Sequence, residues 1–197
     1  MFNPNNGFFR TLSRMVDFVG LSLLWLMLCL PVLTAGPATA ALYHTAAVGL
    51  RQGDDWIFGR FCRSLWENLL QGLLITALCL PLAGALTFGF LVMLAHGNTP
   101  LGTVLWVAYT VVLLLPAGVV CWLFALLGRF SFPTSALFRT AVQLTAAHLP
   151  ATLAAVALVG VAALLSRMFL GLAFVLPAVT AVLVSFPMER VFTQHME

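Results

Sequence analysis

Four stretches of this chain contain no Asp, Glu, Lys or Arg, and they constrain the fold more than any motif does. They cover residues 18–50, 68–128, 140–166 and 168–188. A charged side chain at the centre of a bilayer costs about 2.5 to 3.5 kcal/mol on insertion scales, so segments that span a membrane exclude charge. The pattern predicts an integral membrane protein of the all-α class, a polytopic bundle of transmembrane helices.

The composition supports the same class. Hydrophobic residues make up 62% of the chain and charged residues 8%, with a mean hydropathy of +1.06, whereas soluble domains carry about 25% charged residues. With nearly all of its 197 residues in spans and short loops, the chain is expected to form one integral membrane domain, residues 1–197. The four cysteines have neither C-x-x-C nor metal-site spacing, so no disulfide, metal or cofactor is expected.

The number of spans follows from the length of the apolar runs, because one span needs about 20 residues. Residues 68–128 must hold two helices, and the sequence His-Gly-Asn-Thr-Pro at 96–100 marks the turn between them. From about Leu149 onward we expect a further hairpin of two spans, whose halves are separated by Arg167.

The first apolar run is interrupted by a candidate hairpin turn. We assign five residues to it: Pro31, Thr34, Gly36, Pro37 and Tyr43. Pro37 suits the first turn of a new helix. Either one span is followed by an outside loop, or the chain returns through a short helix, residues 38–50.

The arginines favour the second alternative, since short cytoplasmic loops collect positive charge. Five spans place six arginines on one side and three on the other, whereas six spans place eight on one side and only Arg167 opposite. We therefore expect six spans in three hairpins, with both termini in the cytoplasm. Residues 38–50 are short for a full crossing, and they could be partly re-entrant or buried in protein.

A cleavable signal peptide is the rival interpretation of the N-terminus. Arg10 and Arg14 precede the apolar residues 18–33, and the small-residue sequence Ala-Thr-Ala follows at 38–40. Asp17 and Pro37 fit a signal peptide poorly, so we favour a retained segment.

Two cytoplasmic loops carry most of the polar residues. After Trp56, apolar residues recur at helical spacing with polar residues opposite, and a weaker copy of the pattern begins near Thr134. We expect two amphipathic helices on the inner membrane surface. Asp54 or Asp55 can cap the first of them, which is expected to turn afterwards into the third span. The candidate partner-contact residues of the two helices are Arg60, Arg63, Glu67, Asn68, Gln71 and Arg139. The alternative is contact with lipid headgroups, which attract each arginine by about 1 kcal/mol near an anionic leaflet.

The sequence offers little catalytic chemistry. It contains no P-loop, no H-E-x-x-H, no G-x-S-x-G and no paired-carboxylate cluster, so enzymatic activity is not expected. His44 is the one ionisable candidate at membrane depth, and an ionisable residue at such a position is a functional hypothesis by default. A single histidine near a helix end is, however, commonly a hydrogen-bonded structural residue.

Several fragments resemble the YesL family of small bacterial membrane proteins, a domain of unknown function. They include Phe-Asn-Pro at 2–4, Leu-Pro-Val-Leu-Thr-Ala-Gly-Pro at 30–37, Phe-Cys-Arg-Ser at 61–64 and Pro-Met-Glu-Arg-Val-Phe at 187–192. The resemblance implies the bacterial cell membrane and an association with carbohydrate uptake operons, near ABC-type sugar importers. It implies no catalytic residue and no cofactor.

The sequence thus leads to a hypothesis of a non-enzymatic accessory membrane protein, associated with an ABC-type sugar importer and its permease subunits. The alternative is a small channel or carrier for a neutral solute. Membrane lipids are expected partners and nucleic acid is not. Self-association stays open, because Gly84, Gly89, Gly160 and Gly171 suit helix packing between chains as well as within one.

Cysteine labelling tests the six-span topology. With the native cysteines replaced, a membrane-impermeant thiol reagent added to intact cells should label a cysteine at position 98 and spare one at position 53. Labelling of position 53 from outside would contradict the topology.

Overall fold

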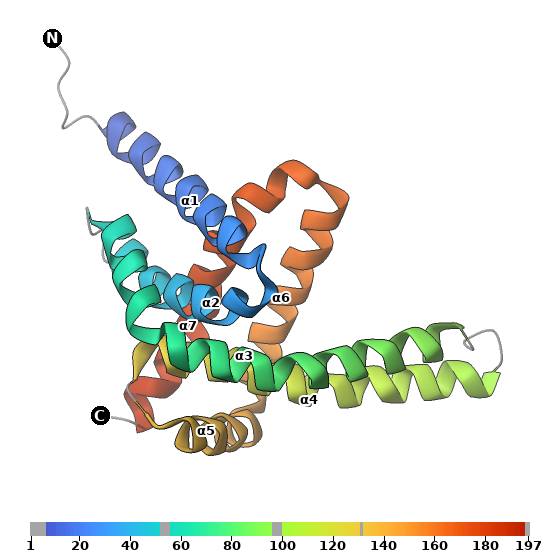
Figure 1. Ribbon diagram of the computed structural model, residues 1–197. Coiled ribbons are helices and arrows are strands. Elements are labelled where there is room, and N and C mark those ends of the chain that lie inside the picture. The colour runs from blue at the N-terminus through green and yellow to red at the C-terminus, as the bar shows by residue number, and fades with distance from the viewer. Residues whose placement is uncertain (1–6, 52–55, 96–99, 131, 196–197) are drawn as a thin grey trace, which may run out of the picture.

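The computed structural model describes residues 7–51, 56–95, 100–130 and 132–195 (Figure 1). In chain order the elements are α1 (Gly7–Cys29), the 3-10 helix η1 (Val32–Thr34), α2 (Ala35–His44), the π-helix η2 (Thr45–Leu50), α3 (Ile57–Ala95), α4 (Pro100–Arg129), α5 (Thr134–Ala147), α6 (Leu149–Met168), the 3-10 helix η3 (Leu170–Phe174) and α7 (Leu176–His195). The described residues contain no strand, so the predicted all-α class is confirmed.

Four of the described helices are long and apolar enough to cross a membrane. The candidate spans are Ile57–Val92 in α3, Gly102–Arg129 in α4, Leu149–Met168 in α6 and Leu176–Thr193 in α7. Three of these helices contain an internal proline, which membrane helices tolerate because neighbouring groups satisfy the freed carbonyls. These helices fit a multi-pass membrane protein. The sequence predicts six crossings, two more than the four candidate spans.

The two expected surface helices are built differently from one another. The second is a separate helix, α5, of 14 residues. The first expected surface helix is not separate from the span that follows it. It forms the opening turns of α3, a single helix of 39 residues that continues without a bend signal into the candidate span. At 1.5 Å per residue, α3 is about 58 Å long, roughly twice the thickness of a hydrocarbon core. No proline separates its polar opening turns from its apolar part, so the helix continues.

Three helical hairpins make up the molecule: α1 packs on α2, α3 on α4, and α6 on α7. In Figure 1, α1 and α3 begin and α4 and α7 end on the left, while the α3–α4 hairpin extends to the right. Arg129 lies in the last turn of α4, and Arg167 lies in the last turn of α6, at the top of the picture.

The short helix α2 lies at the centre of the fold. Seven of its ten residues are buried, and it contacts α1, α3, α4 and α7. Together α2 and η2 span Ala35 to Leu50, about 24 Å of helix, which is shorter than the roughly 30 Å of a bilayer core. The segment at 38–50, whose place the sequence left open, is therefore buried in protein.

Glycines allow the neighbouring helices to approach α2 this closely. A Cβ atom added to Gly72 of α3 would lie 2.7 Å from the Cβ atom and 2.9 Å from the Cα atom of Pro37. A Cβ atom at Gly128 of α4 would collide with the backbone carbonyl of Ala40. Both obstacles include backbone atoms, which cannot rotate aside as a side chain can.

We expect Gly72→Ala to lower the free energy of unfolding by about 1–3 kcal/mol, the usual range for an overpacked core. Gly160→Ala is the matched control, because nothing lies within 4 Å of a Cβ atom at that helical glycine. It should be neutral or slightly stabilising. Unfolding in mild detergent measures both, and equal stability of the two variants would contradict the close contact of α2 with α3.

Candidate functional site

Several polar side chains of the described residues lie where α2 ends, α3 begins, and α4 and α7 end. We call this the arginine-rich end, because Arg51, Arg60, Arg63, Arg129 and Arg190 belong to it. It holds two separate groups, a partly buried ion pair centred on Glu189 and an open polar cavity beside His44. The start of α3 and the ends of α4 and α7, which carry residues of these groups, lie on the left of Figure 1.

The ion pair joins three helices. Glu189 of α7 accepts from Arg129 of α4 over 3.2 Å, and the hydroxyl of Tyr43 in α2 donates to the same carboxylate over 3.4 Å. Only 14% of the Glu189 side chain and 37% of the Arg129 side chain are exposed. A second contact ties the end of η2 to α7, where the guanidinium of Arg51 lies 4.4 Å from the ring centre of Phe186. Such a cation–π contact adds about 0.5–1 kcal/mol at an exposed site.

Aromatic rings continue the junction toward the core. The ring of Phe192 packs edge-on against Trp122 at 5.5 Å and against Phe130 at 5.3 Å. The indole N–H of Trp122 donates to Thr152 of α6 over 2.9 Å. The end of α7 is thus fixed by α2, α4 and, through Trp122, α6.

Sequence reasoning missed Glu189 as a site residue. One signal was available, since Glu189 is the only acidic residue between positions 68 and 196 and it stands at the end of an apolar run. Its partners, Tyr43 and Arg129, lie 146 and 60 positions earlier, so only the folded chain reveals the group.

The polar cavity has a volume of about 300 Å³. Its lining residues are His44, Trp56, Arg60, Arg63, Ser64 and Glu67. Arg63 donates from Nε to the Glu67 carboxylate over 2.8 Å in an exposed i,i+4 pair. His44 lies against Gly128, where an added Cβ atom would be 3.5 Å from the His44 Cβ atom, and among the described residues its buried Nδ1 atom has no hydrogen-bond partner.

The six expected partner-contact residues do not form one group. Arg60, Arg63 and Glu67 line the cavity. The Asn68 amide donates to the carbonyl of Ser64 over 2.9 Å, and the Gln71 amide donates to the carbonyl of Phe132 over 2.7 Å, which links α3 to the start of α5. Arg139 is exposed on α5 and does not line the cavity.

The expected turn residues are also spread out. Pro31 precedes η1, and the hydroxyl of Thr34 donates to the carbonyls of Leu28 and Pro31, which closes the turn. Gly36 and Pro37 are buried in the first turn of α2, and Tyr43 lies near its far end. Asp54 and Asp55, the expected caps of α3, fall outside the described residues.

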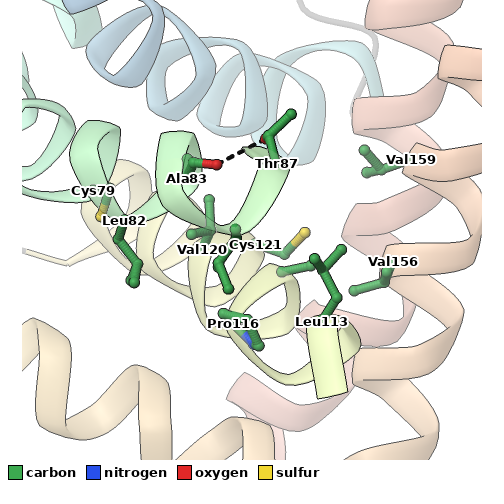
Figure 2. Close-up of a pocket in the computed structure, with 12 residues that line it drawn as sticks. Cys79, Leu82, Ala83, Thr87, Leu113, Pro116, Val120, Cys121, Val156 and Val159 are labelled. Carbon is green, nitrogen blue, oxygen red and sulfur yellow. Dashed lines mark hydrogen bonds between the residues drawn. The ribbon is translucent and has the colours of Figure 1, made fainter. Parts of the chain in front are cut away.

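Two further cavities are apolar. The one in Figure 2 has a volume of about 330 Å³ and lies between α3, α4 and α6, where the hydroxyl of Thr87 is bonded to Ala83 of its own helix. A larger one of about 500 Å³ is lined by α1, α2, α4, α6, η3 and α7. The two cavities share Val120, Cys121 and Val159 as lining residues, so they adjoin. They suit apolar groups.

Metal chemistry finds no support in the described part of the chain, where no three His, Cys, Asp or Glu side chains lie close enough to hold an ion.

The ion pair yields a stability prediction. Glu189→Gln removes the negative charge beside Arg129, and we expect it to lower the free energy of unfolding by about 1–3 kcal/mol, the cost of a poorly satisfied buried group. Glu67→Gln is the control, since its exposed pair with Arg63 contributes about 0–1 kcal/mol. Thermal unfolding in detergent compares the two, and a loss that is no larger for Glu189→Gln would contradict a structural role of the pair.

Comparisons with known proteins address the family. Residues 18–90 match the family model described as a protein of unknown function, DUF624. This segment holds most of α1, all of α2 and most of α3, and with them five of the six expected contact residues. No curated protein and no solved structure matches the chain. The YesL family is the DUF624 family, so the resemblance to it is confirmed over residues 18–90.

Proposed function

We propose that this chain is a non-enzymatic accessory protein of the bacterial cell membrane, which binds a partner membrane protein at its arginine-rich end. One observation carries the proposal: the opening turns of α3 expose a large aromatic ring beside charged side chains. Trp66 is 74% exposed, and the adjacent Arg63 side chain is 73% exposed. Tryptophan and arginine are enriched among the residues that contribute most to protein interfaces.

The resemblance suggests the partner. YesL-like proteins are associated with carbohydrate uptake operons, and the matched segment contains this surface. We therefore propose a permease subunit of an ABC-type sugar importer as the partner, with assembly or regulation of the importer as the role. Arg63, Glu67 and, on α5, Arg139 provide charges of both signs for such a contact.

The proposed topology has six crossings, with both termini in the cytoplasm. The α1–α2 hairpin would add two crossings to the four candidate spans. Burial of α2 among four helices supports this, because backbone that is too short to cross a bilayer alone is tolerated where protein surrounds it. Eight of the nine arginines would then lie on the cytoplasmic side.

Co-purification tests the function. The tagged chain, extracted in mild detergent from its own bacterium, should bring down permease or ATPase subunits, and Trp66→Ala should reduce their recovery at least tenfold. Phe88→Ala is the control, because Phe88 is 70% exposed on the same helix but lies far from the arginine-rich end. Equal recovery with both variants, or a chain that purifies alone, would contradict the proposal.

The adjoining apolar cavities favour one alternative, a small channel or carrier for a neutral solute. Hydroxyls of Thr39 and Thr180 in the larger cavity bond to carbonyls of their own helices, so its walls offer few free polar groups. Solute flux through liposomes that contain only this chain would support the alternative. Trp66→Ala should leave that flux unchanged.

A further inference from the structure

We propose that the larger apolar cavity, between the α6–α7 hairpin and helices α1, α2 and α4, binds the long hydrocarbon chain of an amphiphile. This chemistry is shared by an acyl chain of a membrane phospholipid and by a free long-chain fatty acid. The proposal does not rest on the importer partner suggested above, because Trp66 and the charged side chains of that contact do not line this cavity.

The cavity has the size of a ligand site. Its volume of about 500 Å³ lies within the range of about 300–1,000 Å³ for ligand pockets. The α6–α7 hairpin contributes small side chains to its walls, among them Ala162 and Ala181. The other walls include the rings of Trp25 and Phe124, and the indole N–H of Trp25 donates to the hydroxyl of Thr39 over 3.2 Å. This bond fixes a large ring at the cavity and keeps it from folding into the space that the small residues leave.

The walls offer little for a polar occupant to bond. The hydroxyls of Thr39 and Thr180 donate to carbonyls of their own helices over 2.6 and 2.7 Å, and the hydroxyl of Tyr43 donates to Glu189. An ordered water needs two to four polar partners, and a sugar would lose its hydrogen bonds to water without replacing them. A hydrocarbon chain needs no hydrogen bond, and it provides the dispersion contacts that the lining side chains would otherwise lack.

One lining hydroxyl is left for the polar end of the amphiphile. Ser166 has no hydrogen bond among the described residues. It lies in the last turn of α6, which also carries the basic residue Arg167. The polar end of a bound amphiphile is therefore expected at this end of α6, with its chain along the apolar walls.

The cavity borders the surface that faces lipid. Val159, on its α6 wall, is 44% exposed, and Ala163, one turn later, is exposed as well. Both belong to a candidate membrane span, so hydrocarbon chains of the surrounding bilayer meet the wall of the cavity directly. At Val120, Cys121 and Val159, all labelled in Figure 2, the cavity adjoins the smaller one. A chain too long for the first cavity can extend into the second.

Photolabelling of the full chain in dioleoyl-phosphatidylcholine vesicles tests the occupant. Three probes are compared: phosphatidylcholine with a diazirine in one acyl chain, a diazirine fatty acid, and photoleucine, which stays in water. Val184 and Met188 are a matched pair, because both are buried in α7 but only Val184 lines this cavity. With labelling normalised to the unfolded chain, we expect a lipid probe to label Val184 at least fivefold more than Met188. Label from the phosphatidylcholine would identify a membrane lipid, and label from the fatty acid alone a free amphiphile; either result supports the proposal.

Two variants locate the label. Ala162→Phe fills the cavity and should reduce the label on Val184 several-fold, while Ala157→Phe, the same change at an exposed position of α6 outside both cavities, should not. The proposal is overturned if Val184 is labelled no more than Met188, if photoleucine labels it instead, or if the two variants behave alike. The comparison of Val184 with Met188 needs no substitution, so it decides the question even if Ala162→Phe does not fold. Loss of the importer partner in Trp66→Ala with the label on Val184 unchanged would separate the two proposals.

Discussion

The close packing of α2 between its neighbours is the constraint on which the rest of the structure depends. Ten residues, mostly small, form a helix that α1, α3, α4 and α7 surround. Gly72 and Gly128 bring the backbones of α3 and α4 against it. Association of membrane helices depends on such contacts, because lipid tails are as apolar as leucine and provide no hydrophobic driving force.

The position of α2 also explains where the polar groups gather. Tyr43, near its end, reaches the carboxylate of Glu189, and His44 forms one wall of the polar cavity. The π-helix η2 follows directly, an irregularity that is frequent at functional sites. A short central helix therefore fixes two polar groups at one end of the molecule, where α3 begins and α4 and α7 end.

The sequence predicted those helix boundaries that depend on residues close together in the chain. The end of α3 at Ala95, the starts of α4 at Pro100 and of α6 at Leu149, and the separate helix α5 follow from proline, glycine and helical spacing. Hydropathy could not place residues 38–50, because it measures transfer out of water and cannot distinguish a lipid neighbour from a protein one. The Glu189 group and the His44 cavity were not predictable, since each joins residues that are distant in the chain. The charge pattern did identify Arg60, Arg63 and Glu67, which share one helix face and therefore meet at one cavity.

A double-mutant cycle between α2 and α3 tests the central packing most directly. A Cβ atom at Gly36 would overlap the hydroxyl of Thr76 and would lie 3.0 Å from the ring of Phe124 and 3.1 Å from the carbonyl of Gly72. Gly36→Ala should destabilise the chain, and Thr76→Ala should relieve part of that loss, with a coupling of about 0.5–3 kcal/mol in the free energy of unfolding. Strictly additive effects of the two substitutions would contradict an α2 that is packed against α3 at the centre of the fold.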